Sequence, residues 1–409
     1  MASHRAKARH RVPRTPPLNI NPAIRALLPE MTGWRHALHA MPELGLQEVE
    51  TAAKVAALCR GFGLTVTEGV GVTGVVATLQ GQRAVKGGER GRSIGIRAEL
   101  DALPMTEVLS LPYASTRPGV MHACGHDGHM AILLGAAKAL AANADFAGQV
   151  HFIFQPAEEG LGGALAMLAD GLFDRFPCDE IYALHNSAHP LGRVLVHHGV
   201  VAAAADRFVI TITGQGGHAA TPQDARNPLS AAARMLIALE SLPARVTDAR
   251  LPVVITIGAL NGGDAFNVIP ASAKLAGTVR ALDMATRTRI EAEIRRQVTA
   301  IATAEGVTIE IDYASPFSVT RNTAPEADYV IAAATAIFGA GRVVIDPPPE
   351  MGSEDFGFML EQRPGCYFQL GQGDADHRAY CHDVTYDFND FALEPGASLW
   401  VRLVMDRLG

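Results

Sequence analysis

Residues 121–129 bring several metal-binding side chains into one short segment. The segment reads Met-His-Ala-Cys-Gly-His-Asp-Gly-His, so Cys124, His126, Asp127 and His129 fall just before an apolar, helix-forming run. Thiolate, imidazole and carboxylate groups are the ligands that proteins use for zinc and related divalent metals. A buried cysteine beside surface histidines would give the same pattern. The segment alone therefore leaves metal binding open.

More acids and histidines follow the predicted strands, at the points where those strands end. In chain order they are Glu99, Asp101, Glu158, Glu159, His185, Glu354, Asp355 and, near the C-terminus, His382. Ligands of open α/β sheets bind beyond the carboxyl ends of the strands. Unpaired acids gathered at that edge would be electrostatically unfavourable without a cation. The pattern therefore predicts a metal centre there.

Glu158 and Glu159 are neighbours at an irregular strand end, where adjacent side chains can point in different directions. One carboxylate can then bind metal while the other stays free to accept a proton. A general base close to a metal-activated water is what metal hydrolases require. The alternative is that both acids simply stabilise the N-terminus of the following helix.

The elements that must position these residues alternate between strand and helix from residue 30 to about residue 200. We expect strands at 93–98, 149–155 and 180–184, with helices at 128–143 and 161–170. After residue 315 the same alternation returns, with helices at 324–338 and 397–408 and strands at 342–345 and 365–370. Such alternation favours an α/β fold with a mainly parallel sheet flanked by helices.

The middle of the chain has a different order of strands and helices. Strands are expected at 207–213, 252–260, 271–282 and 307–313, with helices at 227–242 and 284–305. This β-α-β-β-α-β order is typical of a ferredoxin-like α+β unit. We therefore predict a catalytic domain in two parts, 21–201 and 316–409, interrupted by an inserted domain at 202–315. Residues 1–20 are expected to be a disordered basic tail.

Composition narrows the classes of function. A chain of 409 residues favours two domains. The first 17 residues carry five basic side chains and no acid, so the rest has a net charge of −12 (−7 minus +5), which argues against nucleic acid as a partner. No apolar run reaches the ~18 residues of a membrane span. Five irregularly spaced cysteines do not resemble a disulfide framework, which favours the cytoplasm.

Seven ordered motifs carry a family resemblance. They lie at 34–48, 121–130, 156–160, 214–220, 267–270, 351–356 and 386–390. Together they resemble the aminoacylase and carboxypeptidase family of dinuclear metallopeptidases, in its amidohydrolase branch. That branch includes hippurate hydrolases, N-acyl-amino-acid amidohydrolases and plant auxin-conjugate hydrolases. The resemblance implies a zinc-peptidase-like catalytic domain with an inserted lid or dimerisation domain.

Position by position, the resemblance also implies a site. Two divalent metals per subunit (zinc, manganese, cobalt or nickel) would be held by Cys124, His126, Glu159, His185 and His382. Glu158 would be the general base and proton shuttle. Asp101 would orient a ligand imidazole, while Asp127 and His129 would orient ligands or begin the next helix.

The inserted domain is expected to contribute three residues. By resemblance, His218 commonly reaches into the site of the partner subunit, and Asn267 and Arg280 match positions that contact substrate. The guanidinium of Arg280 would suit a substrate carboxylate, although a plain surface charge on a strand is the alternative. The β-branched strand at 252–260 could pair with its twin, which predicts a homodimer or homotetramer.

The sequence departs from the family pattern at three places. Glu99 stands where this branch more often has Asp, and Gln223 stands where it often has His. The run Cys-His-Asp-Val-Thr-Tyr at 381–386 replaces the usual approach to the last motif, although His382 keeps its spacing to Tyr386. The ligand set is complete, so these changes bear on substrate preference.

The sequence thus predicts a metal-dependent enzyme that hydrolyses the amide bond of small N-acyl amino acids. N-Carbamoyl amino acids or small dipeptides are alternative substrates. A hydrolase with Cys124 as nucleophile is a weaker alternative, because a nucleophile needs no cluster of acids around it. A metal-binding or small-ligand-binding module is a third. Neither nucleic acid nor a membrane is expected as a partner.

Overall fold

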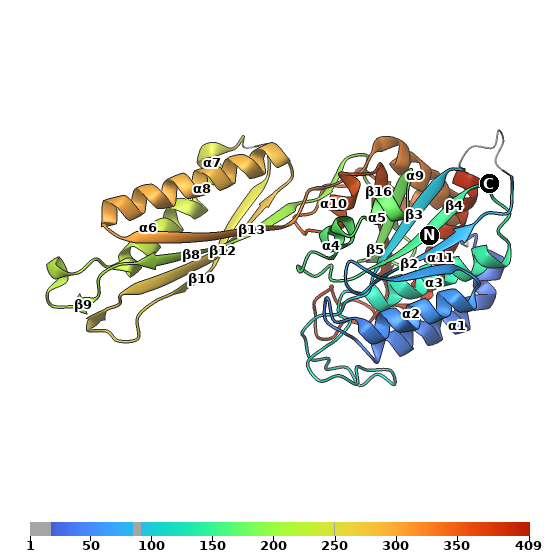
Figure 1. Cartoon of the computed structure of the whole chain (residues 1–409), viewed down its shortest axis with the longest axis horizontal. Helices are drawn as coiled ribbons and strands as arrows, with labels where there is room; N and C mark the ends of the chain where they lie inside the picture. The colour runs from blue at the N-terminus through green and yellow to red at the C-terminus, as the bar shows by residue number, and fades with distance from the viewer. Residues whose placement is uncertain (1–17, 85–90, 249) are drawn as a thin grey trace, which may run out of the picture.

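A computed structural model describes residues 18–84, 91–248 and 250–409. The predicted tail, apart from residues 18–20, lies outside the described residues. Figure 1 shows a large α/β body that contains both ends of the described chain and, beside it, a smaller α+β body formed by the middle of the chain. The residue limits given above for the domains stay predictions, but the chain enters the small sheet at β8 (Ala204–Thr213) and leaves it at β13 (Thr308–Phe317).

The large body is built on an eight-stranded sheet in the order β1-β2-β4-β3-β5-β16-β6-β15. The central strands β4, β3, β5 and β16 are parallel neighbours, and the antiparallel pairs lie toward the two edges. The strands are β1 (Thr65–Val70), β2 (Gly74–Gln80), β3 (Ser93–Glu99), β4 (Gln149–Gln155), β5 (Glu180–Pro190), β6 (Val194–Val196), β15 (Val343–Ile345) and β16 (Gly365–Gly373). The predicted α/β fold with a mainly parallel sheet is confirmed.

Helices cover both faces of this sheet. One apolar cluster joins it to α1 (Pro22–His39), α2 (Val49–Gly61), α3 (His126–Ala142), α9 (Ala324–Phe338) and α11 (Leu393–Leu408). A second cluster joins it to α4 (Gly163–Ala169), α5 (Leu172–Arg175) and α10 (Phe356–Leu360). Phe152 belongs to the first cluster and Ile153 to the second. Because successive strand residues point to opposite faces, the two clusters lie on opposite sides of the sheet.

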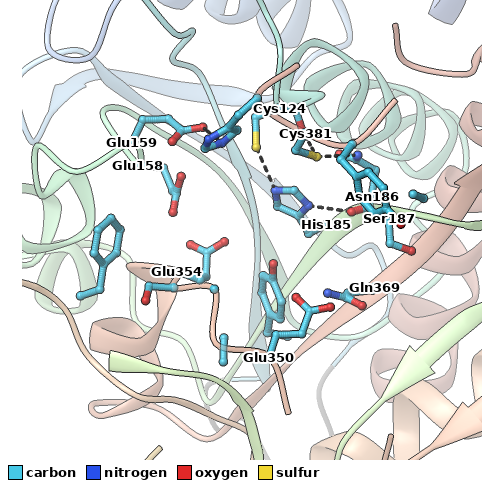
Figure 2. A pocket seen from close by; sticks show the side chains of 18 of the residues that line it. Cys124, Glu158, Glu159, His185, Asn186, Ser187, Glu350, Glu354, Gln369 and Cys381 are labelled. Atoms are coloured by element: carbon cyan, nitrogen blue, oxygen red, sulfur yellow. Dashed lines mark hydrogen bonds and ion pairs between the residues drawn. The ribbon is translucent and has the colours of Figure 1, made fainter. Parts of the chain in front are cut away.

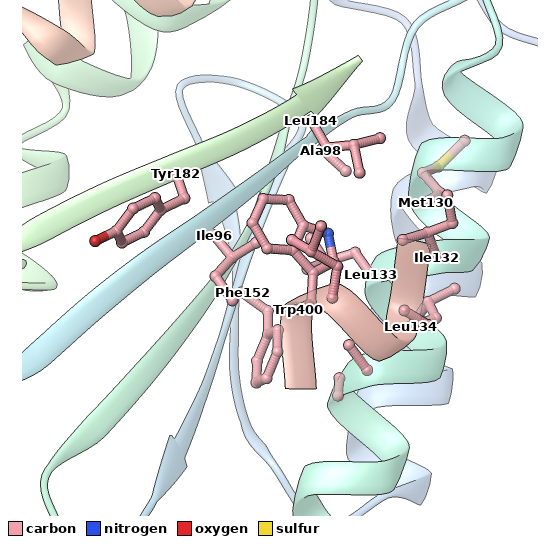
Figure 3. Packing of buried hydrophobic residues seen from close by; sticks show 14 of the residues in the cluster. Ile96, Ala98, Met130, Ile132, Leu133, Leu134, Phe152, Tyr182, Leu184 and Trp400 are labelled. Carbon is pink, nitrogen blue, oxygen red and sulfur yellow. The ribbon is translucent and has the colours of Figure 1, made fainter. Parts of the chain in front are cut away.

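The packing of α3 fixes where the cysteine- and histidine-rich segment lies. Figure 3 shows Leu133 and Leu134 of α3, with Trp400 of α11, packed against Ile96 and Phe152 of the central strands. All five side chains are fully buried or nearly so. Burial of each such apolar side chain stabilises the fold by roughly 1.5–3 kcal/mol. The N-terminus of α3 is thereby held at the carboxyl ends of the parallel strands.

The small body is a four-stranded antiparallel sheet in the order β10-β12-β8-β13, with β10 (Val253–Asn261) and β12 (Ser272–Ala281) completing the strands. The helices α6 (Pro228–Glu240), α7 (Pro243–Val246) and α8 (Met284–Glu305) complete it. The order of elements is the predicted ferredoxin-like one. Ile290, Ile294 and Val298 of α8 are fully buried in its core. Strand β10 is an edge strand, as the dimer prediction requires.

Short strand pairs were not predicted. β7 (Val200–Ala202) pairs with β14 (Thr320–Arg321), and β9 (Gly217–His218) pairs with β11 (Val268–Ile269). Figure 1 shows β9 at the end of the small body that is farthest from the large sheet. Among the described residues, no helix combines the length and the apolar character that a membrane crossing requires.

Candidate metal centre

Four of the five predicted ligands, all except His126, line one cavity of about 720 Å³ beyond the carboxyl ends of the parallel strands. Its walls include Cys124, Glu158, Glu159, His185, Arg280, Glu354, Cys381 and His382. Figure 2 shows Cys124, His185 and the two adjacent glutamates around the same space, with Glu354 on the opposite wall from Cys124. Segments widely separated in the chain therefore meet where the sheet topology placed the predicted site.

Gly125 allows the chain to turn between two of these ligands. It adopts a left-handed conformation (φ 88°) as the N-cap of α3. A Cβ atom at this position would lie 2.4 Å from Asn186 Oδ1 and 2.5 Å from the Tyr386 hydroxyl. Glycine is therefore required both for its conformation and for the close approach. The turn leaves Cys124 on the cavity wall and begins the helix at His126.

Two histidines each have one ring nitrogen held by a backbone carbonyl oxygen. His126 Nδ1 lies 2.8 Å from the Asp101 carbonyl oxygen, and His185 Nδ1 lies 2.8 Å from the Asn186 carbonyl oxygen. His126 Nε2 is buried and has no hydrogen-bond partner in the described chain. His185 Nε2 lies 3.5 Å from Cys124 Sγ. Fixing one imidazole nitrogen so that the other faces a common point is typical of metal ligands.

The ligand atoms form two groups that share one thiol. Cys124, His126 and His185 have ligand atoms within 4.8 Å of one another, and so do Cys124, Glu159 and His382. His382 Nε2 lies 3.1 Å from Glu159 Oε1. Soft thiolate, imidazole and carboxylate donors suit a divalent transition metal. The residues present therefore fit two divalent cations, and Cys124 belongs to both ligand groups.

His129 also lies close to possible ligands, but both of its nitrogens are occupied. Nδ1 lies 2.7 Å from Glu99 Oε2 and Nε2 lies 2.8 Å from Asn186 Oδ1. Asp127 is buried against Arg35 and His39, at 3.3 and 2.9 Å. Although His129 groups with Glu99 and His126 by distance alone, its hydrogen bonds leave it no free lone pair. Both residues hold the surrounding elements in place.

Glu158 and Glu159 have opposite electrostatic surroundings. Burial, followed by the charges of Glu354 and Glu159, raises the pKa of Glu158 well above its ordinary value. Burial also opposes ionisation of Glu159, but the His382 hydrogen bond and the charge of His126 outweigh it and lower that pKa. Neighbouring carboxyls whose pKa values are pushed apart can take different roles in acid–base chemistry. Figure 2 shows the two carboxylates pointing in different directions.

A buried cation supports the acidic wall behind Glu158. Arg97 is 1% exposed, and its guanidinium contacts Glu99, Glu354 and Asp355. The nitrogen–oxygen distances are 2.8 Å to Glu354 and 3.0 Å to Asp355. Sequence reasoning gave Arg97 no role, although a charged residue inside the apolar run 93–98 was a signal. Asn186, which follows His185 on β5, was missed for want of such a signal.

The inserted domain brings one of its three predicted residues to the cavity. Arg280 of β12 lines it, and Nη1 donates to Ser353 Oγ at 2.5 Å. Burial lowers the pKa of Arg280, and no carboxylate pairs with it among the described residues. His218 and Asn267 lie instead at the β9–β11 end of the small body and do not line the cavity. A single copy of the chain therefore does not bring these two residues to the candidate ligands.

The chain is similar to several known proteins in sequence and in fold. The sequence profile described as peptidase family M20/M25/M40 matches residues 95–406. The chain is 40% identical over 394 residues to a hippurate hydrolase from Campylobacter jejuni, covering 96% of this chain and 100% of that protein. It is 36% identical over 361 residues to an N-acetyl-L-cysteine deacetylase from Bacillus subtilis, covering 87% and 84%. Among solved structures, it is similar to the YXEP protein of Bacillus subtilis, described as a dinuclear metal binding peptidase, with 29% identity, a TM-score of 0.79 and coverage of 94% and 99%.

Proposed function

Because this chain belongs to peptidase family M20/M25/M40 and is a hydrolase, we propose that it cleaves the amide bond of small N-acyl amino acids, releasing a carboxylic acid and a free amino acid. The observation that carries this proposal is the pair of ligand groups that share Cys124, with Glu158 directly beside them. Each of these two groups provides three donors for one cation. Glu158 belongs to neither of them, although its carboxylate also lies within 4.8 Å of ligand atoms of His126 and Glu159.

Two divalent cations bound there would polarise the substrate carbonyl and lower the pKa of a water molecule in the site. Glu158 would remove a proton from the attacking water and later donate it to the leaving nitrogen. Its burial and its acidic neighbours, which raise its pKa, suit a group that must both accept and release a proton near neutral pH. Asp101 supports this arrangement by holding His126 Nδ1 and by accepting a hydrogen bond from the Glu159 amide at 2.9 Å.

Arg280 supports a carboxylate-bearing substrate. It is a half-buried cation on the cavity wall, and it lacks an acidic partner among the described residues. A guanidinium can donate two parallel hydrogen bonds to a carboxylate. The relatives named above act on hippurate, an N-benzoyl amino acid, and on N-acetyl-L-cysteine. The acyl group and the amino acid preferred by this chain are to be identified with a panel of N-acetyl, N-benzoyl and N-carbamoyl amino acids.

A second copy of the chain completes the site in this proposal. His218 is exposed, and its Nδ1 accepts a hydrogen bond from the Ala220 amide at 3.0 Å, so Nε2 is free. Phe266, next to Asn267, is 100% exposed, and Val268 is 54% exposed. An apolar tip of this kind favours burial against another surface. We place this tip over the cavity of the partner, with the edge strand β10 as the pairing surface of a homodimer or homotetramer.

Cys124 as a nucleophile is less well supported. A hydrogen bond with Cys381, together with burial, raises the pKa of the Cys124 thiol well above its ordinary value. Nucleophilic cysteines instead depend on a lowered pKa. A metal ion would stabilise the Cys124 thiolate where the protein alone does not.

Substitution of the two adjacent glutamates tests the proposal. We expect Glu158→Gln to lower turnover of every accepted substrate by at least ~100-fold, with the metal content unchanged. Glu159→Gln should lose metal, as measured by elemental analysis of the purified protein. Full activity after removal of metal by a chelator, or substantial turnover by Glu158→Gln, would contradict the proposal.

A further inference from the structure

A second cysteine that the proposed chemistry does not use lies at the metal centre. Cys381 precedes His382 and lines the same cavity as Cys124, from which it is separated by 257 residues. Its Sγ lies 3.7 Å from the Cys124 carbonyl oxygen, and Asn186 Nδ2 donates to it at 3.4 Å. Figure 2 shows both sulfur atoms on one wall of the cavity, above the His185 ring in this view.

These two cysteines differ from the others in access. Cys59, Cys178 and Cys366 are buried in the apolar clusters or beside them, whereas Cys381 is partly exposed. Because Cys124 and Cys381 both line the cavity, a small oxidant that enters it reaches both sulfur atoms. Cys124 lies in a bend and Cys381 in a turn, so neither is part of a helix or strand. Irregular backbone of this kind can make the small adjustment that an S–S bond of about 2 Å requires.

We propose that Cys124 and Cys381 form a reversible disulfide when the metal-free enzyme meets a peroxide. In the first step one thiol is oxidised to a sulfenic acid, while the O–O bond of the peroxide breaks and one water leaves. In the second step the other thiol attacks that sulfur, the S–S bond forms and a second water leaves. Two thiols are thereby oxidised to one disulfide, and hydrogen peroxide is reduced to two waters.

The consequence for metal binding rests on the proposed function. Cys124 is the donor shared by both ligand groups, so a disulfide at this position removes the thiolate that both cations would use. Bound metal has the converse effect, because a coordinated thiolate is no longer available to the peroxide. Metal loading and disulfide formation therefore exclude each other, and a thiol reductant restores the metal-binding form.

The experiment uses the full-length enzyme in two forms, loaded with zinc and stripped of metal by a chelator. Both are treated with hydrogen peroxide, alkylated and digested without reduction, and the peptides are identified by mass spectrometry. We expect a peptide linking Cys124 to Cys381 in the metal-free form only. The metal-free form should then bind at least tenfold less zinc, and dithiothreitol should restore binding.

Two variants provide the controls. Cys381→Ser should give no linked peptide at Cys124, whereas Cys59→Ala, which removes a cysteine from the core, should leave the link unchanged. Recovery of Cys381 as a free thiol in peroxide-treated, metal-free wild-type enzyme would overturn the proposal and leave the proposed function untouched. This readout needs no variant to fold. A link that forms equally in the zinc-loaded enzyme would overturn the switch and would also contradict Cys124 as a metal ligand.

Discussion

At the level of single residues, Arg97 holds together the acidic wall of the cavity. Three carboxylates, those of Glu99, Glu354 and Asp355, are all 3% exposed or less, and the same buried guanidinium contacts each of them. Removing one member of a buried ion network leaves the others as uncompensated charges. Arg97, which does not line the cavity, therefore stabilises the acidic residues around the candidate metal centre.

Arg97→Met should therefore be strongly destabilising. We expect the free energy of unfolding to fall by about 3–5 kcal/mol, the range for a broken buried ion pair. Urea unfolding of the metal-free protein measures it. Arg83→Met is the matched control, because Arg83 pairs with Asp145 on the surface, where the side chains are 47% and 55% exposed. A solvent-exposed pair of this kind contributes little to stability. Equal losses in the two variants would contradict this role for Arg97.

His39 gives the stability a defined pH dependence. Burial opposes its charged form, but Asp127 at 2.9 Å outweighs this and raises the pKa of His39 to about 9. A raised pKa stabilises the fold below the unfolded-state value near 6.5, and the contribution is lost as the pH rises through 9. The full contribution is on the order of 3 kcal/mol. In urea unfolding, His39→Asn should therefore be much less stable than wild type at pH 6 and closer to it at pH 9.5.

The control for this pH effect is His36→Asn on the same helix. His36 and its partner Asp390 are 29% and 31% exposed, so the substitution should cost little at either pH. A stability difference between His39→Asn and wild type that stays constant from pH 6 to 9.5 would show that His39 does not contribute through its charge.

At the level of elements, apolar periodicity predicted the bounds correctly where an element is long and buried on one side. The helix expected at 284–305 and the strand expected at 149–155 coincide with α8 and β4. The strand expected at 180–184 is too short, because β5 continues to Pro190 through polar residues that pair with β16. Likewise α3 begins at His126 rather than at residue 128, because the polar residues His126 and Asp127 belong to its first turn. An apolar pattern therefore locates an element but misplaces its end where that end consists of polar functional residues.

Gly125→Ala tests how the start of α3 positions the ligands. The left-handed conformation and the approach of Asn186 Oδ1 to 2.4 Å from an added Cβ both oppose the substitution. We expect it to cost about 2–4 kcal/mol of stability and to weaken metal binding. Gly33→Ala in α1, where an added Cβ meets nothing within 4 Å, should instead stabilise the protein by about 0.5–1 kcal/mol. Unchanged metal affinity in Gly125→Ala would contradict the proposed role of this turn.

At the level of the whole molecule, the sequence predicted the candidate ligands but not their neighbours. Glu159 and His185 follow predicted strands, and the rule for α/β sheets brings such residues to one edge. The approach of Cys381 to Cys124 depends instead on how the turn after β16 folds over the N-terminus of α3, which no local pattern encodes. The place of His218, at the far end of the small body, likewise depends on the β9–β11 pair.

Because His218 lies far from the cavity of its own chain, mixing two inactive variants tests the proposed dimer. If the partner's tip completes each site, a dimer of one Glu158→Gln subunit and one His218→Ala subunit has one intact site. Random reassociation of the two inactive variants should then restore about a quarter of wild-type activity. Arg280→Ala is the control for His218→Ala, because Arg280 lines the same cavity as Glu158 within one chain, so mixing it with Glu158→Gln should restore nothing. Mixtures no more active than the sum of the parents, or a monomeric mass in light scattering, would contradict a site shared between subunits.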